Sequence, residues 1–304
     1  MTSSSTPAPA ITVVAIVLEG PNRLRSCLNG LRRQENAPAM EIIVPWDGTH
    51  GDSHSLQAEF PEAAFLSQHG RRTYAQLRAV GVAMGRGPII AITEDHCTPD
   101  ANWAAAVFES HKAPHAAIGG AVEKNSPDTA LNWAFYLADY LRYSDPQDGP
   151  SDHLTDCNVT YKRSAIEPLR NVWLEEFHEN TVHGALKARG ESLWLSPRII
   201  VWQKRHLSLG PAIWDRYAFG RLFGSTRVNG ASLITRLKYL VSSALLPLLL
   251  MVRVTGHVAR NPRYAGPYLR SLPVLILINT VWAFGEFTGY LTGRPERRLK
   301  AREA

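Results

Sequence analysis

Three continuous apolar runs in the N-terminal part constrain the fold of this chain most. They read ITVVAIV from Ile11, EIIVPWDGT from Glu41 and PIIAIT from Pro88, and segments with helical spacing separate them. Strands that are apolar along their whole length and alternate with helices are typical of a parallel sheet covered by helices. The sequence therefore predicts an α/β fold. Ligands of such sheets bind beyond the carboxyl ends of the strands, where Asp47 and the group Glu94-Asp95-His96 lie.

Composition along the chain predicts its domains. No repeat or linker is evident within residues 11–206, which we expect to form one domain. Residues 1–10 are polar and rich in proline, without a positively charged leader, so we expect a flexible tail rather than a signal peptide. Residues 207–232 interleave aromatic side chains with arginines, which is typical of an interfacial amphipathic segment. Residues 233–304 are expected to form a membrane-associated helical hairpin with a basic tail.

Charge is distributed unevenly along the chain. The net charge is +6, but residues 1–200 carry 17 Lys and Arg against 23 Asp and Glu, whereas residues 201–304 carry 16 against 4. A basic segment of this kind indicates nucleic acid or an anionic membrane surface as a partner. The basic third also contains LVSSALLPLLLMV and LPVLILINTVWAFG, which a soluble nucleic-acid module would not place beside its arginines. The sequence thus predicts a membrane partner and no nucleic acid.

The two apolar stretches leave three arrangements open. Their uncharged parts, residues 239–252 and 271–285, are shorter than the ~20 apolar residues that a membrane span needs. Basic residues lie between them and after them, whereas spanning chains keep such residues on one side. A re-entrant hairpin in the inner leaflet satisfies both observations. Two spans, or a soluble helical pair that buries a homo-oligomer interface, are the alternatives.

The compartment follows from the same features. Because the chain opens without a signal peptide, we expect the acidic first two-thirds to face the cytoplasm at the inner membrane. Three cysteines, Cys27, Cys97 and Cys157, are odd in number and share no metal-binding spacing. They argue against a disulfide framework and fit a reducing compartment.

Five segments together carry a resemblance to a known family. They are the first two apolar runs, RAVGVAMGRGPIIAITEDHCTPDANW from Arg78, DCNVTYKRSA from Asp156, and FHENTVHGALKARGESLWLSP from Phe177. In this order, over roughly residues 11–225, the chain resembles the inverting glycosyltransferases of family 2. The resemblance implies the GT-A fold, a Rossmann-like and mostly parallel sheet flanked by helices. It also implies a nucleotide-sugar donor, usually a divalent metal, and a single displacement at the anomeric carbon.

The resemblance assigns residues to the donor. Asp47 stands where the family holds the nucleotide base, expected here to be uridine, and a carboxylate accepts the hydrogen bond of a ring N–H. A plain Asp-Gly turn is the alternative. Arg78 matches a basic position near the donor, or else lies on a solvated helix face. Glu94 occupies the first acidic position of the family's Asp-x-Asp group, near the ribose.

The metal group departs from the family pattern. His96 stands at the last position of Asp-x-Asp, with Asp95 as a substitute ligand, and His206 matches a further ligand in some relatives. A basic cluster is the alternative for His206. Imidazole binds Mn²⁺ well whereas Mg²⁺ prefers oxygen, so the resemblance favours Mn²⁺ over Mg²⁺.

The acceptor and the catalytic base also come from the resemblance. Asp156 and Asn158 match the segment that lines the acceptor side, and buried polar packing is the alternative. The family supplies its base from an acidic pair that reads Glu179-Asn180 here, and an amide takes no proton at neutral pH. We therefore assign the base to Glu179, with Asp156 or Glu176 as alternatives.

These assignments favour a hexosyltransferase of the cell envelope that moves a sugar from a UDP-sugar to a lipid or lipid-linked acceptor. The acceptor inference depends on the basic, apolar C-terminal part, which would hold the site at the lipid surface. A scaffold that kept the fold but lost the metal group is the rival hypothesis. A nucleotidyltransferase is a third, which the lack of a Gly-rich phosphate loop with a following lysine disfavours.

Overall fold

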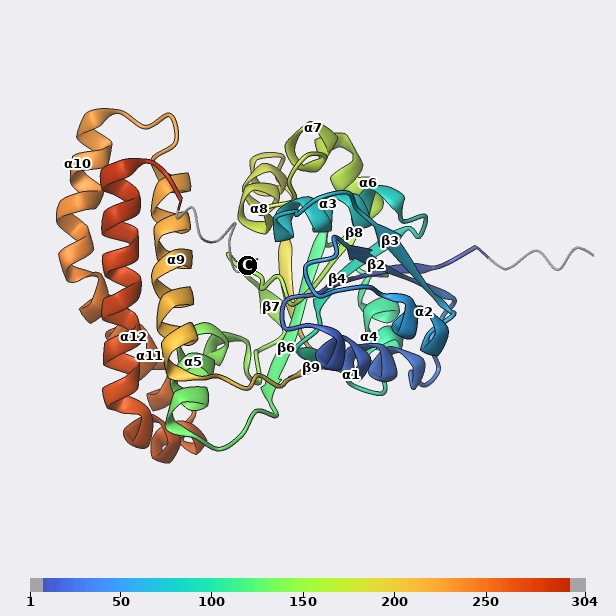
Figure 1. Ribbon diagram of the computed structural model, residues 1–304, viewed down its shortest axis with the longest axis horizontal. Coiled ribbons are helices and arrows are strands. Elements are labelled where there is room, and N and C mark those ends of the chain that lie inside the picture. Colours follow the sequence, from blue (N-terminus) through green and yellow to red (C-terminus); the bar gives the residue numbers. More distant parts are fainter. Residues whose placement is uncertain (1–7, 296–304) are drawn as a thin grey trace, which may run out of the picture. The chain divides into compact units, whose positions relative to one another are not determined.

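The computed structural model describes residues 8–295, which form two compact units (Figure 1). The first unit comprises residues 8–125 and 143–204, and the second comprises residues 126–142 and 205–295. The sequence grouped residues 126–142 with the domain 11–206, whereas the structure groups them with the C-terminal helices. The reason is that helix α5 (Ala130–Asp139) packs along helix α12 (Ala265–Thr292). Most of the expected flexible tail and the end of the basic tail lie outside the described residues.

The described residues of the first unit contain one nine-stranded sheet. Its strands are β1 Ile11–Ile16, β2 Met40–Trp46, β3 Ala63–Ser67, β4 Ile89–Glu94, β5 Cys97–Pro99, β6 Ala117–Lys124, β7 Gly149–Pro150, β8 Asn158–Lys162 and β9 Leu193–Gln203. They run in the order β3-β2-β1-β4-β8-β6-β9-β5, and β7 pairs with β9. Strands β3, β2, β1 and β4 are parallel, and β8 is antiparallel to β4 and β6. The predicted α/β fold with a mostly parallel sheet is confirmed.

Helices cover both faces of this sheet (Figure 1). They are α1 Pro21–Arg32, α2 His54–Glu59, α3 Tyr74–Met84, α4 Trp103–Ser110, α6 Arg163–Ile166, α7 Arg170–Trp173 and α8 Glu179–Ala188, with short 3-10 turns at Leu141–Tyr143 and Glu167–Leu169. Thr73 and Gln76 form a capping box that begins α3, and each partner satisfies a backbone N–H of the first turn. Leu77 and Val82 of α3 then pack against Val14 in the main core. This packing fixes α3 beside the carboxyl ends of β1 and β4.

The second unit is helical. Besides α5 and α12 it contains α9 Leu209–Arg227, α10 Leu233–Ser242 and α11 Leu246–Arg260, with 3-10 turns at Ser243–Leu245 and Pro262–Tyr264. Glycines bring α9 and α12 into backbone contact, because a Cβ on Gly285 would lie 2.3 Å from the Tyr217 carbonyl and one on Gly220 2.5 Å from the Trp282 carbonyl. Small residues at this spacing permit such close packing of helices. The segment expected to be interfacial, residues 207–232, is thus built around a helix packed along α12.

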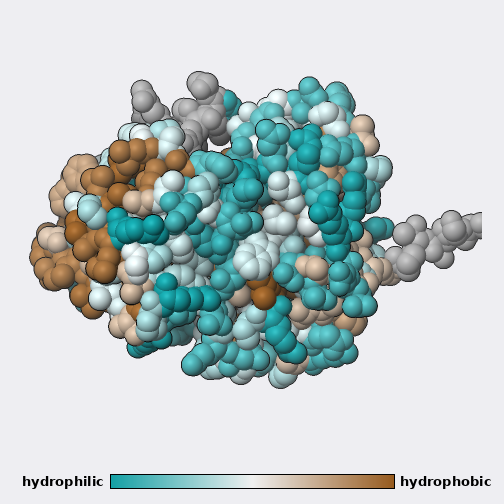
Figure 2. Space-filling model, turned by 90° about the horizontal axis from the view of Figure 1, so that it is seen from below, coloured by the Kyte–Doolittle hydropathy of each residue, from teal (hydrophilic) through white to brown (hydrophobic). Residues whose placement is uncertain are grey.

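Two helical stretches of this unit, Leu233–Arg260 and Pro262–Thr292, are long and apolar enough to cross a membrane by length and composition alone. Only 11% of the most apolar window of the first is buried, against 44% for the second. Apolar side chains gather on the surface of these helices (Figure 2). Such an exposed apolar surface marks an interaction site.

Candidate active site

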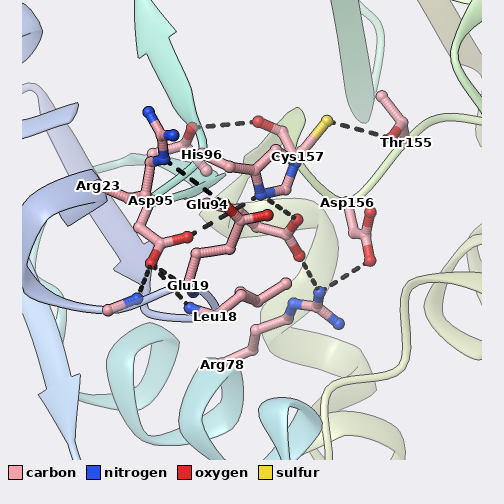
Figure 3. A network of polar contacts seen from close by, with 12 residues as sticks. Leu18, Glu19, Arg23, Arg78, Glu94, Asp95, His96, Thr155, Asp156 and Cys157 are labelled. Carbon is pink, nitrogen blue, oxygen red and sulfur yellow. Dashed lines mark hydrogen bonds and ion pairs between the residues drawn. The ribbon is translucent and has the colours of Figure 1, made fainter. Parts of the chain in front are cut away.

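Asp95 holds the loop that follows β1. Its Oδ2 accepts the backbone N–H groups of Leu18, Glu19 and Gly20 at 3.0, 2.7 and 2.9 Å (Figure 3). Gly20 has a φ of 104°, a conformation that side chains disfavour, and α1 begins at the next residue. One oxygen of Asp95 therefore has a structural role, while its Oδ1 lies 3.9 Å from Nδ1 of His96.

Arg78 joins three carboxylates from separate segments. Its Nη2 donates to Glu94 Oε1 at 2.7 Å and to Asp156 Oδ2 at 2.8 Å (Figure 3). Its Nη1 lies 3.5 Å from Glu179 Oε2. The Arg78 side chain is only 7% exposed, so it does not lie on a solvated helix face. A guanidinium suits this position because its planar fork donates in several directions at once. The carboxyl end of β4, the segment before β8 and the start of α8 thereby meet at one point.

The carboxylates of Glu94, Glu179 and Asp95 lie close together in a buried place, and their pKa values are raised. Burial, followed by the negative charge of Asp156, raises the pKa of Glu94 to about 8, although Arg78 opposes the shift. Burial and Asp156 also raise the pKa of Glu179 above its ordinary value. Burial raises the pKa of Asp95 to about 6 against the effect of its backbone N–H donors. Shifted carboxylates gathered at a strand edge are typical of a functional site.

Glu94, Asp95 and His96 lie where the resemblance implies a divalent metal. His96 Nδ1 lies 3.6 Å from Glu94 Oε2 and 3.9 Å from Asp95 Oδ1. Asp95 Oδ1 is buried and accepts no hydrogen bond from the described residues. Two carboxylate oxygens and an imidazole nitrogen are donors that Mn²⁺ accepts. The ligand chemistry of these side chains therefore suits such an ion, with His96 as the residue that lies near both carboxylates.

A second donor set shares His96. One ligand atom each from His96, Cys97 and Cys157 lies within 4.8 Å of the others, and all three residues are buried. The sequence found no shared metal spacing among the cysteines because this proximity arises across β5 and the segment before β8. Burial raises the pKa of the Cys97 thiol, whereas metal binding needs the thiolate. Of the two sets, the one with Glu94 and Asp95 is that which the resemblance assigns to the ion.

Asp47 follows β2 and has the local structure of a turn. Its Oδ1 accepts the N–H of Thr49 and its Oδ2 that of Arg72, both at 3.0 Å. Burial opposes ionisation, but these backbone donors hold the pKa of Asp47 below its ordinary value. Both carboxylate oxygens thus have backbone partners, and the assignment of Asp47 to the nucleotide base stays a prediction.

The two residues assigned to the acceptor, Asp156 and Asn158, have different surroundings in the structure. Asp156 lies on Arg78, but Asn158 is fully buried and donates to the carbonyls of Ala121 and Ile199, both at 2.9 Å. Its Oδ1 accepts from Trp103 Nε1 at 3.0 Å. These bonds occupy the Asn158 amide, which joins strands β6, β8 and β9 rather than the Arg78 cluster.

The remaining assigned residues lie outside the Arg78 cluster. Glu176 contacts His178 at 3.0 Å, and both side chains are more than 40% exposed. Asn180 donates to Glu179 Oε1 at 3.3 Å. His206 lies in the exposed segment between β9 and α9, in the second unit. Its role as a ligand stays a prediction.

One buried pair near this cluster escaped sequence reasoning. Tyr161 OH lies 2.9 Å from His183 Nε2, and the negative charge of Glu179 contributes to the raised pKa of Tyr161 after burial. Burial lowers the pKa of His183 to about 4. No sequence signal marks this pair. Tyr161 lies in β8 and His183 lies one helical turn after Glu179, so their proximity depends on how α8 packs on the sheet.

Comparisons with known proteins concern the family and the fold of this chain. The family model "Glycosyl transferase family 2" matches residues 12–170. A mannosyltransferase from Pyrobaculum calidifontis, PcManGT, solved with GDP-Man and Mn²⁺, is 16% identical with a TM-score of 0.52, and the match covers 95% of this chain and 86% of that one. GalNAc-T7, solved with UDP, GalNAc and Mn²⁺, is 15% identical with a TM-score of 0.49, covering 66% and 45%.

A search of curated proteins found no match. The family match nevertheless spans more than half of the 304 residues and includes β1, α3, β4 and Asp156. These are the elements that build the carboxylate cluster, apart from α8. The chain belongs to glycosyltransferase family 2, and it is a glycosyltransferase with a GT-A fold.

Proposed function

We propose that the protein moves a sugar, with inversion, from a nucleoside diphosphate donor to a lipid or lipid-linked acceptor at a membrane surface. The observation that carries this proposal is the Arg78 cluster. It brings Glu179 to the group Glu94-Asp95-His96, so that a candidate base and a candidate donor site are neighbours. This arrangement favours an enzyme over the rival hypothesis of a non-catalytic scaffold.

Glu179 is the base of the proposed reaction. It takes the proton of the acceptor hydroxyl while that oxygen forms a bond to the anomeric carbon. The bond from that carbon to the diphosphate oxygen breaks, and its electron pair leaves with the nucleoside diphosphate. A raised carboxylate pKa favours this role, because a base accepts a proton best when its pKa approaches the working pH. Arg78 orients the carboxylate from 3.5 Å.

The donor is held at the carboxyl ends of β1, β2 and β4. Asp47 binds the base, Glu94 lies toward the ribose, and Asp95 with His96 would hold a divalent ion. That ion would offset the negative charge that develops on the diphosphate. Uridine is the proposed base, and because the similar mannosyltransferase was solved with GDP-Man, guanosine is the competing one. Mn²⁺ rather than Mg²⁺ follows from the imidazole.

The acceptor is proposed to be lipid-linked because the second unit exposes apolar helices. Leu233, Ile234 and Val241 are 82%, 83% and 70% exposed, and a membrane would cover them. The site would then face the cytoplasm at the inner membrane, as the sequence predicts.

Donor hydrolysis tests the enzymatic proposal. Purified full-length protein in detergent is incubated with Mn²⁺ and a panel of α-linked UDP- and GDP-sugars, and NMR follows the released sugar. We expect one donor to be hydrolysed with the β-anomer appearing first, and Glu179→Gln to stop the release. Glu176→Gln is the matched control. Absence of both hydrolysis and nucleotide binding would establish the scaffold hypothesis, and an α-anomer would exclude inversion.

A further inference from the structure

Two sulfur atoms and an imidazole meet beside the carboxylate cluster of the first unit. One ligand atom each from His96, Cys97 and Cys157 lies within 4.8 Å of the other two, and none of the three residues is more than 2% exposed. Figure 3 shows the His96 ring beside Cys157. The three residues come from the turn after β4, from β5 and from the segment before β8, so the fold and not a single loop brings them together.

The backbone of the sheet holds these donors in place. Thr93 Oγ1, near the end of β4, donates to the Cys157 carbonyl at 3.1 Å. Cys97 belongs to β5, which pairs with β9, and the His96 carbonyl accepts from the Lys204 N–H at 2.8 Å. A ligand set on a rigid scaffold binds an ion without first ordering the chain.

Cys27 shows what ordinary packing of a cysteine looks like in the same unit. Free cysteines are often buried as small apolar side chains, and Cys27 is fully buried in α1. It is not a member of the set whose ligand atoms lie within 4.8 Å of one another. Apolar packing accounts for a single buried thiol of this kind, whereas at Cys97 and Cys157 two thiols and an imidazole converge on one point.

The chemistry of this set differs from that of the neighbouring carboxylates. Thiolate and imidazole are the usual ligands of Zn²⁺, whereas Mg²⁺ and Mn²⁺ suit oxygen ligands. When Zn²⁺ binds, each thiol releases one proton to solvent, and the two thiolates balance the charge of the cation. The buried complex is then neutral, which avoids the cost of burying an unpaired charge. Three protein ligands leave one position of a tetrahedral ion open.

We propose that His96, Cys97 and Cys157 form a Zn²⁺ site, which differs in its ligands from the proposed donor-ion site of Glu94, Asp95 and His96. The two sets share His96, whose Nδ1 lies 3.6 Å from Glu94 Oε2. An ion on the sulfur set therefore competes for the imidazole, and Zn²⁺ opposes nucleotide binding that depends on Mn²⁺. This competition rests on the donor site of the proposed function, whereas the Zn²⁺ site itself does not.

Metal titration tests the site with a readout that needs no nucleotide. Reduced, full-length protein is freed of metal and titrated with Co²⁺ without oxygen, because Co²⁺ bound to thiolate shows strong charge-transfer absorption. We expect this absorption in the unsubstituted protein, and added Zn²⁺ should displace the Co²⁺ from it. Zn²⁺ should also raise the temperature of unfolding, since it binds the folded chain. Protein that binds neither ion would overturn the proposal.

Serine variants locate the ligands. Cys157→Ser keeps a polar atom beside Thr155 Oγ1, which lies 3.4 Å from Cys157 Sγ, but it removes a thiolate. It should lose the absorption and bind Zn²⁺ at least ~100-fold more weakly, because loss of even an outer partner of a metal site costs up to that factor. Cys97→Ser should behave alike, and Cys27→Ser is the matched control that should keep both properties. Absorption that persists in both Cys97→Ser and Cys157→Ser would overturn the proposal.

Nucleotide titration tests the shared imidazole. Zn²⁺ should weaken the Mn²⁺-dependent binding of uridine diphosphate or guanosine diphosphate to the unsubstituted protein and to Cys27→Ser, but not to Cys157→Ser. Weakening of the same size in Cys157→Ser would overturn the competition, because Zn²⁺ would then act on the carboxylates. If neither nucleotide binds with Mn²⁺, the proposed donor site fails, while the Co²⁺ absorption still decides the Zn²⁺ site.

Discussion

The Arg78 guanidinium lies 3.5 Å from the Glu179 carboxylate, and this contact joins helix α3 to the start of α8. The same guanidinium binds Glu94 at the end of β4. A lysine would keep the charge but would present a single point donor instead of a fork. Arg78 is therefore the residue on which the position of the proposed base depends.

Replacement of Arg78 should damage both stability and turnover. Arg78→Gln leaves the buried Glu94 and the partly exposed Asp156 without their cation, and removal of one partner from a buried ion pair costs about 3–5 kcal/mol. We expect a lower free energy of unfolding in urea titrations and no measurable donor hydrolysis. Arg78→Lys should recover part of the stability but little of the turnover. Equal turnover in Arg78→Lys and the unsubstituted protein would contradict a positioning role for the fork.

Replacement of Glu179 should lower turnover alone. Glu179→Gln removes a proton acceptor while keeping the shape of the side chain, so donor affinity by calorimetry should not change. Loss of general base assistance is worth about 10²–10⁴-fold, and we expect at least a ~100-fold slower transfer. If Glu179→Gln keeps its turnover and Asp156→Asn loses it, the base is Asp156.

The pH dependence of turnover should report the crowding of the carboxylates. The base must be ionised, so turnover falls as pH decreases through its pKa. Burial and the charge of Asp156 raise the pKa of Glu179, so the acid limb should lie at higher pH than for an ordinary glutamate, near 4.3. Asp156→Asn removes the repulsion and should move that limb to lower pH. A shift in the other direction would show that Asp156 does not act on the base.

Stability should fall on mild acidification because of a buried histidine. Burial lowers the pKa of His183 to about 4, so the unfolded chain, with a pKa near 6.5, binds a proton more readily than the folded one. The free energy of unfolding should therefore decrease as pH falls from about 6.5 to 4, by up to ~1.4 kcal/mol per pH unit for this group. His183→Gln should reduce this slope in urea titrations, with His54→Gln at an exposed position as control.

Local sequence predicted the parallel strands β1, β2 and β4 because each is a continuous apolar run, but it did not predict β3 (Ala63–Ser67), which is only partly buried. It also placed Glu94, Asp95 and His96 at the correct strand end. It left open whether Asn158 lines the acceptor side or packs as a buried polar residue, because the partners that decide this, Ala121 and Ile199, come from other strands. The sequence grouped the residues of helix α5 with residues 11–206 by position in the chain, whereas this helix packs against α12, which is distant in the sequence. Contacts between distant segments leave no local pattern.

The identity of residue 96 should determine which metal supports donor binding. The imidazole nitrogen of His96 lies 3.6 Å from Glu94 Oε2, and it supplies the one nitrogen donor among the three side chains of the proposed ion site. His96→Asp would replace that nitrogen with oxygen, the ligand that Mg²⁺ prefers. We expect the unsubstituted protein to bind uridine diphosphate or guanosine diphosphate more tightly with Mn²⁺ than with Mg²⁺, and to lose most of this affinity in EDTA. His96→Asp should bind with either ion, while Asp47→Ala should weaken binding with both, because it acts on the base. Calorimetric titration of each nucleotide with each ion measures these differences. Nucleotide affinity that is the same with Mn²⁺, with Mg²⁺ and in EDTA would show that residue 96 holds no ion.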